Sequence, residues 1–142
     1  MTRIPDKPQD IFIALTEDYK KAFGNDLVSL IVYGSAAAGY YVKGKSDINL
    51  LVILTAEGME RLEDSLPVVK NWRKRSVAVP WVMTREFIWK SLDCYPIEFL
   101  NLQVNHILIH GEDVLAPLQF KPQDLRLQIE KELKGKLMLL RE

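Results

Sequence analysis

The sequence predicts an α/β protein, also described as α+β, with a mixed twisted sheet of about four or five strands flanked by helices. Two apolar runs, residues 27–33 and 48–54, have the length and composition of buried strands. Apolar residues at helical spacing precede the first run, follow the second and recur near the C-terminus. Strand and helix patterns that alternate along a chain are typical of a sheet covered by helices.

The first two helices have recognisable ends. Asp6 suits the N-cap of the first helix, with Gln9 three residues later, and Gly24 ends its apolar stripe. Thr55 is placed to cap a helix that follows the second strand. Because Pro67 lies within that helical pattern, we expect a kink there or two short helices.

The middle of the chain predicts two more strands and two short helices. Val77, Val79, Trp81 and Met83 stand at every second position, which is the period of a strand, and Pro80 indicates that this strand lies at a sheet edge. Thr84 suits the cap of a short helix. Residues 96–102 are interpreted as a strand, although their period is not clean, and residues 106–111 as a short helix that packs on the sheet.

The last predicted helix covers about residues 122–142. Its apolar stripe consists of Leu125, Ile129, Leu133, Leu137 and Leu140. Two interpretations stay open: a second domain follows this helix and is missing here, or the helix packs on a protein partner.

Bulk properties fit one domain over residues 1–142. Nineteen basic residues balance nineteen acidic ones, so net charge gives no pull toward nucleic acid or a membrane surface. The acidic first twenty residues do not fit a signal peptide, and no apolar run is long enough to span a bilayer. With Cys94 as the one cysteine, the sequence predicts a cytoplasmic protein.

The motif with the clearest chemistry joins the two apolar strands. Gly34 and Ser35 directly follow the first strand, and Asp47 and Asn49 stand at alternate positions where the second strand begins. Alternate residues of a strand share a face, so two oxygen-bearing side chains would point the same way. Read in isolation, Gly34-Ser35 would be an ordinary turn and Asp47 a turn-capping residue.

This pattern resembles the signature of the nucleotidyltransferase superfamily, which includes DNA polymerase beta and small bacterial nucleotidyltransferase domains. In that family an apolar strand ends in Gly-Ser, and an Asp-x-Asp motif lies on the next strand. Gly34, Ser35, Ser46 and Asp47 match the signature, and Asn49 stands in place of the second Asp. The resemblance implies that the Gly-Ser backbone holds a triphosphate and that the acidic residues bind Mg²⁺.

The resemblance also implies roles for residues outside the central pair. A third carboxylate would come from a later strand, which makes Glu98 the candidate; its alternative is a surface glutamate or an ion-pair partner. Asp47 and Glu98 would be catalytic and would bind Mg²⁺ together with Asn49, a neutral and therefore weaker ligand. Ser46 and Lys45 would join Gly34 and Ser35 around the phosphates.

The leading hypothesis is a Mg²⁺-dependent nucleotidyltransferase-like domain that transfers a nucleotide monophosphate from a nucleoside triphosphate, with ATP as the expected substrate, to an acceptor that the sequence does not identify. The alternative is a catalytically inactive domain of the same fold that serves nucleotide binding or protein interaction. Asn49 favours the alternative, and the intact Gly-Ser and Ser-Asp pairs favour the enzyme.

Overall fold

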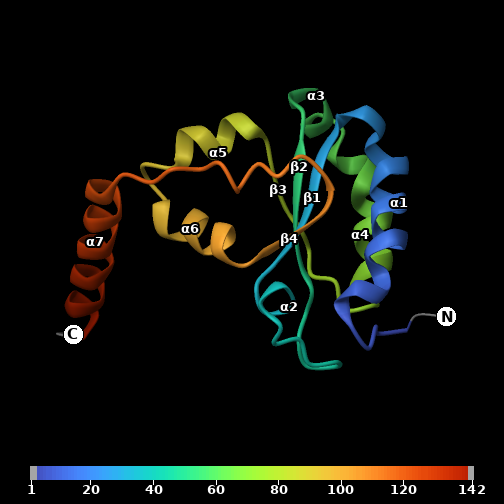
Figure 1. Ribbon diagram of the computed structural model, residues 1–142, viewed down its shortest axis with the longest axis horizontal. Helices are drawn as coiled ribbons and strands as arrows, with labels where there is room; N and C mark the ends of the chain where they lie inside the picture. The colour runs from blue at the N-terminus through green and yellow to red at the C-terminus, as the bar shows by residue number, and fades with distance from the viewer. Residues whose placement is uncertain (1–2, 141–142) are drawn as a thin grey trace.

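The computed structural model describes residues 3–140. Its centre is a mixed sheet of four strands in the order β3-β2-β1-β4 (Figure 1). The strands are β1 (Leu27–Tyr33), β2 (Asn49–Leu54), β3 (Trp81–Met83) and β4 (His106–Gly111). β1 pairs antiparallel with both β2 and β4, and β2 pairs parallel with β3. The predicted fold class is confirmed.

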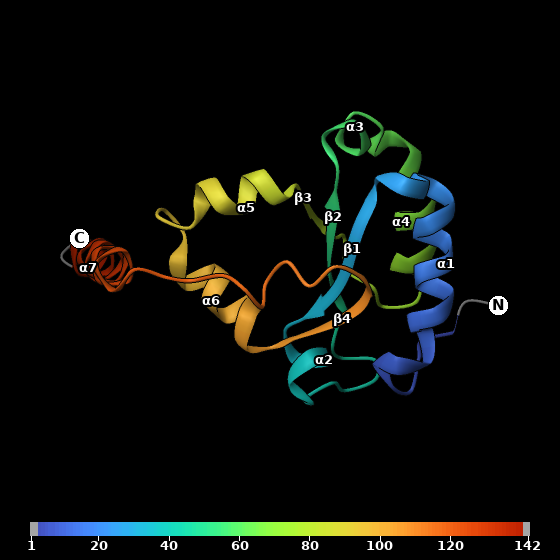
Figure 2. The same ribbon diagram turned by 45° about the horizontal axis from the view of Figure 1, so that its top comes forward.

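Helices cover both faces of this sheet (Figures 1 and 2). One face carries α1 (Phe12–Phe23) and α4 (Leu66–Arg73), and the other carries α5 (Arg85–Ser91) and α6 (Pro96–Val104). Two separate apolar clusters fill the two interfaces. Apart from Ser29 and Asn49, the middle strands are apolar, because successive side chains enter opposite clusters and both clusters exclude water.

Shorter elements and one long helix complete the chain. They are 3₁₀ turns at Pro8–Ile11, Gly24–Asp26 and Leu62–Ser65, the helices α2 (Ser35–Ala38) and α3 (Ala56–Met59), and α7 (Pro122–Leu140). The predicted C-terminal helix is therefore present, and the last two residues of the predicted range lie outside the described part. Within residues 3–140, no helix combines the length and the apolar character needed to cross a bilayer.

Several predicted boundaries are confirmed. Thr55 accepts a hydrogen bond from the backbone N–H of Gly58, and Thr84 accepts one from Phe87, both at 3.1 Å. Pro67 lies in the first turn of α4, so the chain forms separate short helices where an interruption was expected. β3 lies at a sheet edge, as Pro80 indicated, but it is shorter than the predicted strand at residues 77–83: it begins after Pro80, and Val77 makes only an isolated bridge to Ile48.

The first helix begins differently from the prediction. Lys7, rather than Asp6, is the N-cap residue of the opening 3₁₀ turn, and its backbone N–H donates to the Asp10 carboxylate at 3.1 Å. Asp6 instead pairs with Lys43 across the chain at 2.6 Å. The lysine holds the pKa of Asp6 below its usual value. A long-range ion pair therefore takes the side chain that the local pattern assigned to a cap.

Two predicted elements are wrong in type. Residues 96–102, predicted as a strand, belong to α6, in which Pro96 occupies the first turn and Phe99 and Leu102 face the core three residues apart. Residues 106–111, predicted as a short helix, form β4 along the free side of β1. Ile107 and Ile109 alternate toward the sheet core there, which is a strand period.

Candidate functional site

The two halves of the motif meet at the end of β1. Tyr33, the last residue of β1, is paired in register with Asn49, the first residue of β2. Gly34 follows with φ of +77°, and a Cβ added there would lie 2.7 Å from the Asn49 side-chain nitrogen. A side chain at position 34 would be strained by its backbone conformation, and the end of the Asn49 side chain would have to move to make room for it. The turn requires glycine because of the positive φ.

A pocket of about 480 Å³ opens beside this turn. It brings together three residues that the sequence predicted as functional, namely Gly34, Ser35 and Glu98. The remaining lining residues come from β1, α2 and the loop after it, β3, and α6 with the residue that follows it: Tyr33, Ala38, Tyr40, Trp81, Asn101, Leu102 and Asn105. The wall opposite the turn is therefore α6, the element that the sequence misassigned.

Glu98 reaches this pocket from the first turn of α6 and not from a strand. Its two carboxylate oxygens accept hydrogen bonds from the side-chain amide of Gln128, at 2.8 and 2.7 Å. Gln128 lies on α7, and its own amide oxygen accepts from the backbone N–H of Ile97 at 2.9 Å. α7 thereby fixes the orientation of the carboxylate that faces the pocket.

Asp47 lies apart from the residues that line the pocket. Its side chain is 54% exposed and pairs with the Arg73 guanidinium at 3.6 Å. Ile48, which separates Asp47 from Asn49, is fully buried and bridges to Val77. Asp47 and Asn49 flank this buried residue. Arg73, at the end of α4, competes with a metal ion for the Asp47 carboxylate.

The two remaining predicted phosphate contacts lie on the loop before Asp47. The Ser46 hydroxyl accepts a hydrogen bond from the backbone N–H of Val42 at 3.0 Å, and the Ser46 N–H donates to the Val42 carbonyl at 2.8 Å. Ser46 thus closes its own loop. The N–H of Lys45 also donates to that carbonyl, at 3.1 Å, and the residue is exposed.

The donor set determines which cation would fit. Across residues 3–140, no three side chains of the acidic, histidine or cysteine type come together as a metal cluster. The predicted Mg²⁺ ligands provide two carboxylates and one amide, all oxygen donors of the kind that hard cations prefer. This chemistry suits Mg²⁺ held jointly with phosphate oxygens better than an ion held by protein side chains alone.

Aromatic residues at the pocket were not predicted as functional. The rings of Tyr33 and Trp81 stack with centroids 5.5 Å apart. Burial raises the pKa of the Tyr33 phenol above its ordinary value. Trp81 and Glu98 also line a second, adjoining pocket of about 510 Å³ with Phe87, Tyr95 and Phe99. The sequence offered one signal for these residues, namely a tryptophan directly after Pro80 in the predicted edge strand.

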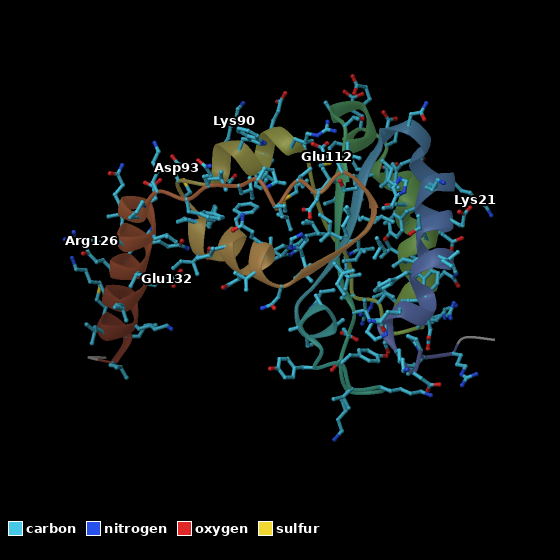
Figure 3. All side chains as sticks on the ribbon, viewed as in Figure 1. Lys21, Lys90, Asp93, Glu112, Arg126 and Glu132 are labelled. Carbon is cyan, nitrogen blue, oxygen red and sulfur yellow. The ribbon has the colours of Figure 1, made fainter. Side chains whose placement is uncertain are left out.

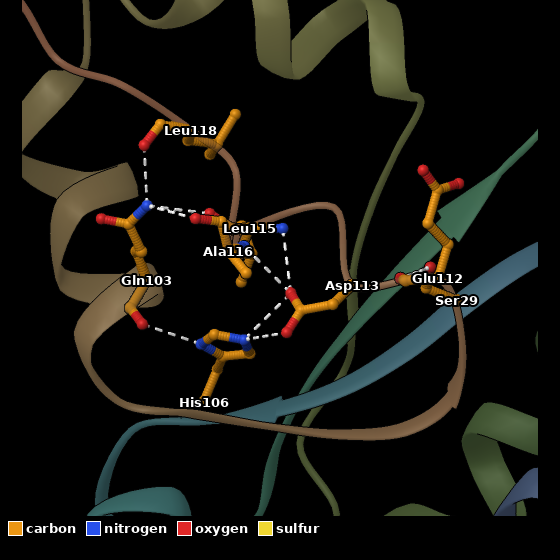
Figure 4. A network of polar contacts seen from close by, with 8 residues as sticks. All are labelled: Ser29, Gln103, His106, Glu112, Asp113, Leu115, Ala116 and Leu118. Carbon is orange, nitrogen blue, oxygen red and sulfur yellow. Dashed lines mark hydrogen bonds and ion pairs between the residues drawn. The ribbon is translucent and has the colours of Figure 1, made fainter.

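A network of polar contacts ties α6 to the segment after β4 (Figure 4). The Gln103 amide donates to the carbonyls of Leu115 and Leu118, at 3.0 and 2.8 Å. His106 places one ring nitrogen 2.9 Å from the Gln103 carbonyl and the other 2.9 Å from the Asp113 carboxylate. These contacts hold the pocket wall that carries Glu98, Asn101 and Asn105.

Comparisons with known proteins place this architecture. The structure aligns with the spectinomycin adenyltransferase AAD(9) from Enterococcus faecialis, solved with ATP and spectinomycin, at a TM-score of 0.51 and 14% identity. That alignment covers 87% of this chain and 65% of the other, so the chain spans about two-thirds of that protein. This chain has the nucleotidyltransferase fold.

Two further structures align over more of their length but less closely. They are a toxin-antitoxin with AMP-PNP, at a TM-score of 0.43 and 11% identity, and a mutant of the toxin-antitoxin MntA-HpeT, at 0.41 and 10%. Each alignment covers 94% of this chain. It covers 91% of the aligned chain in the first structure and 90% in the second. No known family profile matches the sequence, and no curated protein matches it.

Proposed function

We propose that this nucleotidyltransferase-fold domain binds a nucleoside triphosphate, with ATP as the first candidate, and transfers its nucleotide monophosphate to an acceptor hydroxyl. The observation that carries the proposal is the pocket in which the Gly34-Ser35 turn faces Glu98. The adenyltransferase of the same fold was solved with ATP, which supports ATP as the nucleotide to test.

The turn, Asn49 beside it, and Asp47 outside the pocket lining form the nucleotide side of the proposed site, and Asp47 must leave its ion pair with Arg73 to take part. The absence of a side chain at Gly34 lets phosphate oxygens approach the backbone amides of the turn. Asp47 and Asn49 would hold Mg²⁺ together with the phosphates, and Lys45 would add positive charge from the exposed loop. When bound, Mg²⁺ would stabilise negative charge on the phosphates.

Glu98 was also predicted to bind Mg²⁺, but it lines the pocket on α6 while Asp47 lies outside that lining, so we assign Glu98 to the acceptor side and not to the metal. The acceptor oxygen forms a bond to the α-phosphorus, and the bond from that phosphorus to the oxygen bridging to the β-phosphate breaks. Pyrophosphate leaves with the electron pair. The Glu98 carboxylate takes the proton that the acceptor hydroxyl loses, with Gln128 holding it in place.

Calorimetric titration with ATP, in the presence and absence of Mg²⁺, tests the nucleotide side. The proposal expects Mg²⁺-dependent binding that Asp47→Ala abolishes and Asn49→Asp strengthens, since the added carboxylate gives the cation a second anionic ligand. Asp93→Ala is the matched control, because Asp93 is exposed and lies at the end of α5 near α7 (Figure 3). Equal binding by the wild type and all three variants would contradict the metal assignment.

Glu98→Gln tests the acceptor side separately. It should leave ATP affinity within about twofold and reduce label transfer from α-labelled ATP into a cell extract by about 10²-fold or more, the size expected for loss of a general base. A variant that transfers label as well as the wild type would remove Glu98 from the reaction while leaving the nucleotide site intact.

A second candidate function is a catalytically inactive domain that binds a nucleotide or a protein. The neutral Asn49 and the ion pair between Asp47 and Arg73 favour it, because both weaken the site for a cation. ATP binding that is independent of Mg²⁺, with no label transfer, would support this candidate. Restored Mg²⁺ dependence in Asn49→Asp would then indicate an ancestral metal site.

A further inference from the structure

The long C-terminal helix carries an apolar stripe that faces solvent. α7 lies at the edge of the molecule, beyond α6 (Figures 1 and 2), and contacts it through the buried Gln128. Ile129, Leu133 and Leu137, here called the α7 stripe, lie on a different side of the helix and are 47%, 57% and 59% exposed. Apolar side chains lined up in this way are typical of a helix that packs on another surface.

The charges beside the α7 stripe follow an inverted symmetry around Leu133. At about 100° per residue, Glu130 and Lys134 lie on one flank of the stripe, and Glu132 and Lys136 lie on the other. Each flank thus has a glutamate on the N-terminal side of Leu133 and a lysine on its C-terminal side. A second copy of the same helix turned end to end presents the opposite charge at every one of these positions.

We propose that the α7 stripe binds the α7 stripe of a second copy of this chain, antiparallel, about a two-fold axis at Leu133. In this arrangement Ile129 meets Leu137 of the second copy, and Leu133 meets its own counterpart. A two-fold axis perpendicular to the helices brings equal flanks together, so Glu130 of one copy approaches Lys134 of the other. Glu132 and Lys136 meet in the same way on the second flank.

The alternative parallel pairing is opposed by the same charges. Parallel helices bring unequal flanks together, which would put Glu130 beside Glu132 of the second copy and Lys134 beside Lys136. Like charges at these positions repel, whereas the antiparallel arrangement has an opposite charge at each contact. Within one helix Glu130 pairs with Arg126 at 3.3 Å and Glu132 accepts from Gln128 at 3.2 Å. For a pair of copies, the charge pattern favours the antiparallel direction over the parallel one.

Sedimentation velocity of the full chain over a wide range of concentrations tests the proposal. The wild type should form dimers reversibly, and Leu133→Asp should be monomeric at all concentrations, because it places two carboxylates together at the axis. Leu133 is more than half exposed, so this change leaves the core untouched. A wild type that stays monomeric, or a dimer that Leu133→Asp leaves intact, would overturn the proposal.

Two charge variants test the direction of pairing. Lys134→Glu with Lys136→Glu makes both flanks acidic, and Glu130→Lys with Glu132→Lys makes both basic. Each variant alone should dimerise at least about tenfold more weakly than the wild type, since attraction becomes repulsion at four contacts. An equimolar mixture of the two should recover dimers that contain one copy of each. Failure of the mixture to associate, while both variants keep the wild-type circular dichroism spectrum, would contradict pairing through these flanks.

Discussion

The two faces of the sheet are closed in different ways. On one face, α1 and α4 pack apolar side chains directly on Leu30 and Val32, and Trp72 of α4 is almost fully buried there. On the other face, α6 and residues 112–118 cover Ile31. Gln103 donates to the Leu118 carbonyl there, and the Asp113 carboxylate accepts hydrogen bonds from His106 and from the Leu115 N–H, which holds this cover together. The candidate pocket lies at the second face, where α6 forms its wall.

This difference indicates that the pocket wall formed by α6 can be altered more readily than the opposite face of the sheet. The face closed by apolar helices is determined mainly by burial, with one side-chain hydrogen bond from Trp72 to Asp18 at 2.9 Å, and it tolerates few rearrangements because interiors are close-packed. A wall held by a polar network depends on a small number of directional contacts. Substitutions in that network should move α6 and the pocket while leaving the opposite face of the sheet intact.

The largest effects should come from truncating neighbouring residues of β1 that enter opposite faces. Leu30→Ala and Ile31→Ala each remove a fully buried side chain, and each should lower the free energy of unfolding by about 2–5 kcal/mol. Leu30→Ala should cost more, because α1 and α4 are less able to collapse into the cavity than the polar-held cover of Ile31. Urea unfolding of both variants measures the difference.

Exposed Ile13→Ala on α1 provides a control, since its side chain is 82% exposed and should matter little. Equal losses for the two β1 variants would mean that both faces are equally rigid. A larger loss for Ile31→Ala would reverse the comparison.

Asp113→Asn should have the next largest effect. The carboxylate accepts from His106 at 2.9 Å and from the backbone N–H groups of Leu115 and Ala116, both at 3.1 Å. An asparagine oxygen can keep the backbone bonds but loses the charge, so we expect a loss of about 1–3 kcal/mol. Asp113→Ala loses all of these contacts and should be worse. Hydrogen exchange at α6 should become faster in both variants. Unchanged exchange would mean that the contacts of Asp113 do not hold α6 in place.

The same carboxylate should make stability depend on acid pH. Burial by itself would raise the pKa of Asp113, but the hydrogen bonds from His106, Ala116 and Leu115 hold it below its ordinary value of 3.8. The stabilisation by the ionised carboxylate is therefore complete above about pH 4 and is lost as the pH falls through the lowered pKa of the folded state. Asp113→Asn should flatten this acid slope, as urea unfolding at several pH values would show.

The sequence predicted the two central strands better than the elements that flank the pocket, for physical reasons. β1 and β2 are apolar runs whose type follows from composition, and the structure has β1 at the predicted residues. α6 has a weak period because it buries Phe99 and Leu102 while also presenting Glu98 and Asn101 to the pocket. β4 was mistaken for a helix because the period of a six-residue run is short evidence for either type.

The candidate site was predictable only in part. The glycine at position 34 follows from the motif, and the structure adds its positive φ and the close approach of Asn49. Glu98 was selected as a carboxylate near the site, but on the wrong kind of element. The ion pair of Asp47 with Arg73 joins residues 26 positions apart, and no local pattern indicates such a contact. That this ion pair weakens Asp47 as a cation ligand therefore follows from the structure and not from the sequence.

The smallest expected losses of stability come from removing two helix caps, one on each side of the sheet. Thr55 caps α3 and also donates its hydroxyl to the Asp26 carboxylate at 2.7 Å, whereas Thr84 caps α5 through one bond to Phe87. Thr84→Ala should cost about 1 kcal/mol, the usual value for a lost N-cap, and Thr55→Ala should cost more because Asp26 loses a donor as well.

Conservative serine variants at both positions keep the hydroxyl and should recover most of the stability, which separates capping from methyl packing. If Thr84→Ala proved the more harmful change, the cover over the second face would depend on the start of α5 as strongly as on the network around Asp113. The loss of stability would then be accompanied by faster hydrogen exchange in α6, because α5 and α6 share the apolar cluster that contains Ile88 and Phe99.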